Sequence, residues 1–215
     1  MPVRKVPKNY LFVTGRHATA LSSEMVEFES TLEKDFMLLL DFDPRVSSYE
    51  AQPVRIPLPD GGKYVPDLLV SFHKGPDGVE PPRDLLEVKT QAFLDRYADE
   101  YAAKFAAADV YALERGWRFK KKTEKEIRTP RLANIKFLRG YRRNVPDPVE
   151  IDTLLTKLQM LGGCSSSQAL VEALGGTDIE RARWLPVLWH LIAVRRIQVD
   201  MDIAFEADVP LWLEG

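Results

Sequence analysis

The fold of this 215-residue chain is decided by two short apolar stretches, YVPDLLVSF at residues 64–72 and DLLEVKT at residues 84–90. Each has an apolar centre and is bounded by turn-forming residues, as strands are. The tight-turn sequence PDGG at 59–62 precedes the first stretch, and a loop rich in Gly, Pro and Asp at 74–83 joins the two. Together with a third strand-like run at 46–56, they predict an antiparallel three-stranded meander.

Helical segments surround this meander. Apolar residues at four helically spaced positions predict a helix over 25–41, which follows an irregular arm at 1–22. A second helix is expected over 93–115, and a strand over 117–122 then returns to the sheet. A mixed sheet flanked by helices in this order is an α/β arrangement.

A change of pattern near Pro146 and Pro148 predicts two domains, at residues 1–145 and 146–215. A short basic helix at 131–143 is expected to lead out of the first domain. In the second domain, helices are expected to begin at Pro148, near Ser165 and near Thr177, followed by a strand pair over 197–213. Three helices and a hairpin are typical of a winged helix-turn-helix.

Three charged residues in the meander are placed to carry chemistry. Glu87 and Lys89 are two apart on one expected strand, so they share a face, and the neighbouring strand can bring Asp67 beside them. Two carboxylates and the Val88 carbonyl suit Mg²⁺, with Mn²⁺ able to substitute, and Lys89 could orient or deprotonate an attacking water. This is the PD-(D/E)xK nuclease pattern. The alternative is that Asp67 merely ends a strand and that Glu87 and Lys89 form an exposed ion pair.

Charge is unevenly spread along the chain. Residues 115–143 hold twelve Lys or Arg against two Glu, although the whole chain carries a net charge of −2. Such a basic stretch favours binding to DNA phosphates, whereas a solvated surface is the alternative. The residues of this stretch that we expect to contact DNA are Lys120, Lys121, Lys122, Arg128, Arg131 and Lys136.

The chain resembles the TnsA transposon endonucleases over most of its length. The segments that carry the resemblance are FESTLEKDF at 28–36, LLDFDP at 39–44, Gln52-Pro53, Pro66-Asp67 and LEVK at 86–89. The resemblance implies a restriction-endonuclease-like core in which a helix glutamate, here Glu33, joins the active site as a further catalytic and metal-binding carboxylate. For Glu33, a capping box with Ser30 has equally suitable spacing.

The resemblance also implies partners. The family supplies the subunit that cuts the 5′ side of each transposon end, while a TnsB-type DDE transposase cuts and joins the 3′ side and a TnsC-type AAA+ ATPase regulates both. Double-stranded DNA at the transposon ends would be the substrate. Family members use the C-terminal domain for partner contacts, which favours protein binding there over direct DNA recognition.

Two other functions stay open from the sequence: another PD-(D/E)xK nuclease, such as a restriction or repair enzyme, and a catalytically silent DNA- or protein-binding adaptor. A single cysteine, Cys164, excludes an internal disulfide and fits a reducing environment. No apolar run approaches the length of a membrane span, so we expect a cytoplasmic bacterial protein without membrane contacts.

Overall fold

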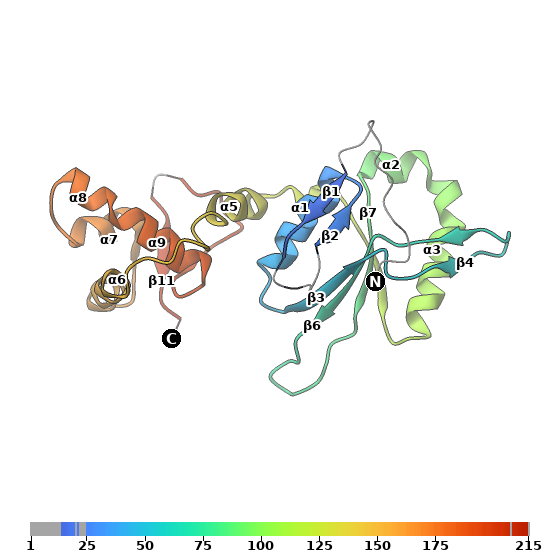
Figure 1. The fold of residues 1–215 in the computed structure, drawn as a ribbon, viewed down its shortest axis with the longest axis horizontal. Coiled ribbons are helices and arrows are strands. Elements are labelled where there is room, and N and C mark those ends of the chain that lie inside the picture. Colours follow the sequence, from blue (N-terminus) through green and yellow to red (C-terminus); the bar gives the residue numbers. More distant parts are fainter. Residues whose placement is uncertain (1–13, 20, 22–24, 207, 215) are drawn as a thin grey trace. The chain divides into compact units, whose positions relative to one another are not determined.

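The computed structural model describes residues 14–19, 21, 25–206 and 208–214. The chain divides into two compact units, one ending at Arg128 and the other beginning at Thr129 (Figure 1). The boundary expected between residues 145 and 146 therefore lies inside the second unit. Among the residues described, no helix is both long and apolar enough to cross a membrane.

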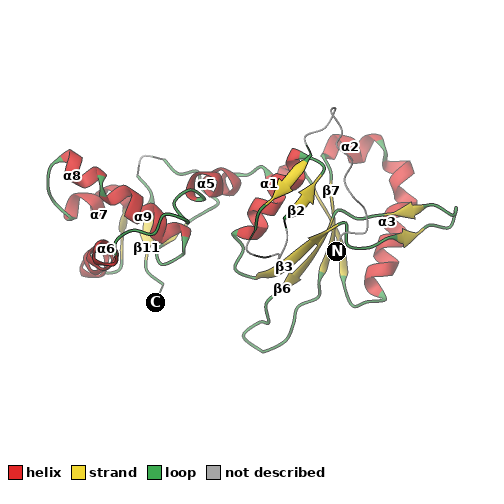
Figure 2. Ribbon diagram, viewed as in Figure 1, coloured by secondary structure: helices red, strands yellow, loops and turns green. Residues whose placement is uncertain are grey.

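The first unit is built on a four-stranded sheet (Figure 2). Its strands are β3 (Val46–Ala51), β6 (Leu68–Phe72), β7 (Asp84–Val88) and β8 (Arg118–Lys122), in the order β3-β6-β7-β8. The first three are antiparallel, as the meander predicts, and β8 pairs parallel to β7. Every residue of β7 is buried, because the strand lies inside the sheet and is covered by helices.

Helices flank this mixed sheet, which confirms the α/β prediction. They are α1 (Thr31–Asp41), α2 (Gln91–Arg96), α3 (Ala98–Leu113) and α4 (Glu124–Ile127). Helix α1 contacts β7 and α3 contacts β8. Ala108 and Ala112 of α3 pack with Leu69 and Leu85 of the sheet, where small side chains let the helix approach closely.

The N-terminal part of this unit differs from the prediction of one helix over 25–41. Val26–Phe28 forms strand β2, which pairs antiparallel with β1 (Gly15–His17). Strand β1 lies in the segment that was expected to be an irregular arm. Residues 1–13 of that arm lie outside the described part of the chain. Helix α1 begins only after Ser30, whose hydroxyl accepts a hydrogen bond from the Glu33 amide. The cap fixes the helix start, and the apolar stripe upstream of it belongs to a strand.

The strand expected over 46–56 is interrupted. Strand β3 ends at Ala51, and the chain turns at Gln52, whose φ of 48° lies in the left-handed region. A separate two-stranded hairpin follows, formed by β4 (Ile56–Pro57) and β5 (Lys63–Tyr64) around the PDGG turn. The helix expected over 93–115 is likewise divided into α2 and α3 at Tyr97.

The second unit contains five helices and three short strands in its described residues. They are α5 (Pro130–Leu138), α6 (Pro148–Met160), β9 (Cys164–Ser166), α7 (Ser167–Ala173), α8 (Asp178–Ala182), α9 (Trp184–Ala193), β10 (Gln198–Val199) and β11 (Pro210–Trp212). The strands form one antiparallel sheet in the order β10-β11-β9. The third helix expected in this unit is divided into α8 and α9. The expected strand pair corresponds to β10 and β11, which are shorter than predicted, and β9 adds a third strand to their sheet.

Helix α5 belongs to this unit because its polar side chain Asn134 is anchored there. Asn134 Nδ2 donates hydrogen bonds to the carbonyl oxygens of Met201 (3.0 Å) and Ile203 (2.7 Å). Its Oδ1 accepts one from the Phe205 amide at 3.1 Å. The charge run at 131–143 gave no sign of this buried contact, so the sequence predicted an outward basic helix.

Candidate active site

The sheet register brings Asp67 and Glu87 together. Leu68 of β6 faces Leu86 of β7, and continuing that antiparallel register by one step sets Asp67 opposite Glu87. Asp67 lies directly before β6, and its backbone amide donates to the Leu86 carbonyl at 3.0 Å. The two carboxylates thus lie where both strands end, beside Lys89.

The Lys89 ammonium group occupies the centre of this arrangement. Its Nζ lies 2.9 Å from Asp67 Oδ2 and 3.3 Å from Glu87 Oε1. It also lies 3.3 Å from the carbonyl oxygen of Val88. Burial acts to lower the pKa of Lys89, but the charges of Asp67 and Glu87 outweigh it and raise that pKa, so the group stays charged.

Glu87 is not part of an exposed ion pair, since only 2% of its surface is accessible. Its Oε2 accepts a 2.6 Å hydrogen bond from the hydroxyl of Tyr64. Burial and the nearby charge of Asp67 raise the pKa of Glu87 to about 7. Burial and the charge of Glu87 also raise the pKa of the Tyr64 phenol, which therefore remains a donor.

Glu33 combines the two arrangements that the sequence left open. Its Oε1 accepts from the Ser30 hydroxyl at 3.0 Å and its Oε2 from the Glu29 amide at 2.8 Å, so the carboxylate closes the N-terminus of α1. Burial and the charge of Asp67 raise the pKa of Glu33 to about 7, so the Asp67 charge acts on the same carboxylate that caps the helix. Capping and proximity to the site are compatible here.

Gln52 links these groups through its backbone and its side chain. Its amide nitrogen donates to the Asp67 carbonyl at 2.8 Å, and its Nε2 donates to Glu29 Oε1 at 2.8 Å. The side chain is buried, and its Oε1 has no hydrogen-bond partner. The left-handed backbone of Gln52 therefore holds the end of β3 against Asp67.

The donor set fits a hard divalent cation. Two carboxylates and one carbonyl, from Asp67, Glu87 and Val88, gather about the Lys89 ammonium, and oxygen ligands of this kind suit Mg²⁺ or Mn²⁺. Within the described residues no group of three Asp, Glu, His or Cys side chains is arranged to hold a metal ion. The Glu33 carboxylate oxygens are hydrogen-bonded at the start of α1.

The lysines expected to contact DNA do not form one continuous strip. Lys120, Lys121 and Lys122 alternate along β8, so successive side chains leave opposite faces. Lys120 Nζ donates to Asp84 Oδ2 at 2.8 Å, and Lys122 Nζ donates to Glu126 Oε1 at 2.6 Å. Lys121 is exposed.

The remaining candidates are divided between the two units. Arg128 ends the first unit and pairs with Asp35 at 3.1 Å, whereas Arg131 and Lys136 belong to α5 in the second. Arg131 pairs with Asp202 at 2.6 Å. Any phosphate that these arginines bind must compete with carboxylates already in place.

Tyr64 was not found from the sequence. A tyrosine at the end of a strand is usually a core residue, and the hydrogen bond that joins it to Glu87 spans 23 positions of the chain. Its place three residues before Asp67 was the available signal. The strand register decides which residue Tyr64 faces, and the composition and hydrophobic periodicity of the sequence do not reveal that register.

Comparison with known families agrees with this geometry. The model of the TnsA-like endonuclease N terminal family matches residues 43–124, and that of the TnsA endonuclease C terminal family matches residues 126–201. No curated protein matches the chain. The first match contains Asp67, Glu87 and Lys89, and the two matches meet close to the division between the compact units. The chain therefore belongs to the TnsA endonuclease family.

Proposed function

We propose that this chain is the Mg²⁺-dependent DNA endonuclease subunit of a cut-and-paste transposase, which cleaves the 5′ side, the non-transferred strand, at each transposon end. The observation that carries the proposal is the arrangement of Asp67 and Glu87 about the Lys89 ammonium and the Val88 carbonyl. Membership of the TnsA family supplies the transposition context.

The roles of the residues follow from their surroundings. Asp67, Glu87 and the Val88 carbonyl would hold the metal, and Glu33 would be the third acidic residue of the site, adding negative charge that acts on Asp67. When bound there, Mg²⁺ would neutralise the scissile phosphate and lower the pKa of a water molecule. Mn²⁺ should substitute, because it accepts the same oxygen ligands.

Lys89 is proposed to orient the attacking water and to offset the charge that develops on the phosphate. Its ammonium is held by Asp67 and Glu87, and 24% of its side chain is accessible, so it can reach a bound substrate. Because the raised pKa keeps it protonated while these carboxylates are charged, the group stabilises negative charge more readily than it removes a proton.

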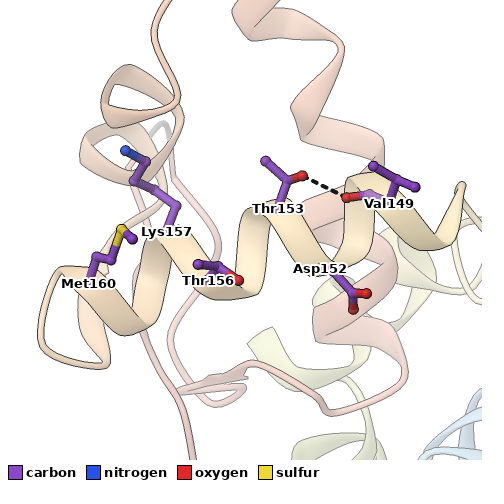
Figure 3. Close-up of a pocket in the computed structure, with 6 residues that line it drawn as sticks. All are labelled: Val149, Asp152, Thr153, Thr156, Lys157 and Met160. Carbon is purple, nitrogen blue, oxygen red and sulfur yellow. Dashed lines mark hydrogen bonds between the residues drawn. The ribbon is translucent and has the colours of Figure 1, made fainter.

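We further propose that residues 146–215 form a winged helix-turn-helix domain that contacts the partner proteins. Helices α6, α7 and α9 with the sheet β10-β11-β9 supply the parts of such a fold. Large apolar side chains are exposed on it, Ile179 at 85% and Met160 at 75% among them, as expected for a protein-binding surface. Met160 and Val149 lie at opposite ends of a shallow pocket on the outer side of α6 (Figure 3).

The partners in this proposal are a TnsB-type DDE transposase and a TnsC-type AAA+ regulator, acting with this chain on double-stranded DNA in the bacterial cytoplasm. The six basic residues named above are proposed to guide the DNA to the site. Because phosphate contacts release counterions, binding should weaken as salt rises. At Lys120, Lys122, Arg128 and Arg131 the phosphates would displace intramolecular carboxylates.

A cleavage assay on transposon-end DNA tests this proposal. The purified chain with Mg²⁺ should cut little on its own, and cutting should begin when the transposase and the regulator are added. Sequence-specific cutting of bare DNA by the chain alone would instead identify a restriction-type nuclease. Full activity of the assembled reaction with Asp67→Ala would identify an adaptor.

A further inference from the structure

Tyr64 is a buried residue next to the site, and the proposed function gives it no role. It ends β5, three residues before Asp67, and 5% of its surface is accessible. Its hydroxyl lies 2.6 Å from Glu87 Oε2. This hydrogen bond is buried, and it joins side chains of β5 and β7, two strands that belong to different sheets.

The hydrogen bond has a counterpart on the other carboxylate. Asp67 Oδ2 accepts a 2.7 Å bond from the Val88 amide, and Glu87 Oε2 accepts its 2.6 Å bond from Tyr64. Each carboxylate therefore has one oxygen tied by a neutral donor of the protein. Glu87 Oε1 and both oxygens of Asp67 lie within reach of the Lys89 ammonium.

The Tyr64 ring is fixed on several sides. Tyr64 faces Ile56 across the β4–β5 hairpin and packs in the buried cluster with Leu69 and Leu85. Phe105 of α3 meets it edge to face, with ring centroids 6.3 Å apart and an interplanar angle of 71°. A ring held in this way delivers its hydroxyl to one position, as a second-shell donor must.

We infer that Tyr64 is a positioning residue for Glu87: it holds Oε2 and so presents Oε1 alone to the cation. The inference rests on the proposed function, since it gives Glu87 the role of metal ligand. A carboxylate whose second oxygen is tied binds in one orientation, whereas a free one would rotate about its terminal bond and share its oxygens among several arrangements.

The variant Tyr64→Phe removes the hydroxyl and keeps the ring. Tyr49→Phe is the matched control, because Tyr49 is also buried, at 1% accessible, and its hydroxyl also donates to a carboxylate, Asp41 Oδ1 at 3.0 Å. Both variants lose a phenol–carboxylate hydrogen bond made by a buried tyrosine. Their melting temperatures should therefore fall alike, and only Tyr64→Phe should change the site.

The measurement is a calorimetric titration of the metal-free full chain with Mn²⁺, at a temperature where circular dichroism shows every variant folded. Tyr64→Phe should weaken Mn²⁺ binding by about 10-fold or more, the scale of a lost second-shell partner. Tyr49→Phe should keep the wild-type affinity. In a Glu87→Gln background, Tyr64→Phe should add no further loss, because the group that it positions is no longer a carboxylate.

Equal Mn²⁺ affinity in Tyr64→Phe and Tyr49→Phe, with binding still weakened in Glu87→Gln, would overturn the inference and leave the proposed function standing. Unchanged binding in Glu87→Gln as well would overturn both, because Glu87 would then be no ligand. An additional loss on adding Tyr64→Phe to Glu87→Gln would also count against the inference, since Tyr64 would be acting through another group.

Discussion

The backbone amide of Val88 donates a 2.7 Å hydrogen bond to Asp67 Oδ2, so the strand that carries Glu87 also fixes the carboxylate of its neighbour. The two acidic groups are therefore positioned by the sheet itself. Loss of either carboxylate should act on the site without dismantling the fold, because both lie where the strands end.

Asp67→Ala and Glu87→Ala should both lose Mn²⁺ binding and DNA cutting. The rate should fall by at least about 100-fold, the scale of losing one electrostatic group at a reacting centre. Calorimetry and a single-turnover cleavage assay measure the two effects. Asp77→Ala is the control, since Asp77 accepts a bond from the Val79 amide in an exposed loop. Undiminished Mn²⁺ binding in both carboxylate variants would refute the assignment.

Lys89→Ala should separate metal binding from catalysis. Its ammonium lies within 3.3 Å of Glu87 Oε1 and of the Val88 carbonyl, so removing it leaves the donor set intact and more negative. Mn²⁺ affinity should hold or rise, while the cleavage rate should fall by about 100-fold. The exposed Lys63→Ala serves as the control. Weaker Mn²⁺ binding in Lys89→Ala would mean that the lysine supports the ligands and has no part in the reaction.

The metal-free protein should lose stability as pH rises. The pKa values of Glu33 and Glu87 are raised from 4.5 to about 7 on folding. At a pH between these two pKa values the folded chain holds protons that the unfolded chain has released. The stability that these protons contribute is complete below the lower pKa and is lost as pH rises through the upper pKa. Melting curves in EDTA between about pH 5 and 8 measure the slope.

Glu87→Gln should flatten that slope, and Mn²⁺ should raise the melting temperature most at the alkaline end, where the carboxylates are charged. The exposed Glu80→Gln should leave the slope as in the wild type. An identical pH dependence in Glu87→Gln and the wild type would contradict the raised pKa of Glu87.

Ser30→Ala should cost about 1 kcal/mol of folding stability, as loss of a helix N-cap does. It should also slow cleavage, because Ser30 holds the Glu33 carboxylate at 3.0 Å. Ser166→Ala removes the equivalent cap of α7, where Ser166 accepts from the Ala169 amide, and should cost similar stability at full activity. Equal activity in the two variants would show that the Ser30 hydroxyl is not needed to position Glu33 for cleavage.

Asn134→Ala should destabilise the second unit by about 1–3 kcal/mol, since it removes three hydrogen bonds made by a buried side chain. Mn²⁺ binding should not change, because the ligands belong to the first unit. Chemical denaturation of the full chain measures the cost, with the exposed Asn144→Ala as control. No loss of stability would argue that α5 is not anchored through Asn134.

The sequence predicted those features that depend on local pattern. The meander, the sheet flanked by helices and the proximity of Asp67 to Glu87 and Lys89 all follow from short strands with a period of two. Helix α6 begins where expected because Asp147 caps it and Pro148 suits its first position. Each of these signals lies within a few consecutive residues of the sequence.

The features that the sequence missed depend on contacts between distant segments. Val26–Phe28 became a strand because β1 was available to pair with it, and α5 joined the second unit because Asn134 meets carbonyl groups some 70 positions away. Lys120 and Lys122, which are proposed to contact DNA, have carboxylate partners that become visible only when β7, β8 and α4 are assembled.

Strand-specific mapping of DNA breaks tests the central claim most directly. Transposon-end DNA is incubated with the transposase, the regulator, Mg²⁺ and either the wild-type chain or Asp67→Ala. The account predicts that 5′-side cuts vanish with Asp67→Ala while cutting and joining of the 3′ strand persist. Identical breaks on both strands with the two proteins would contradict it, because Asp67 would then have no part in cleavage.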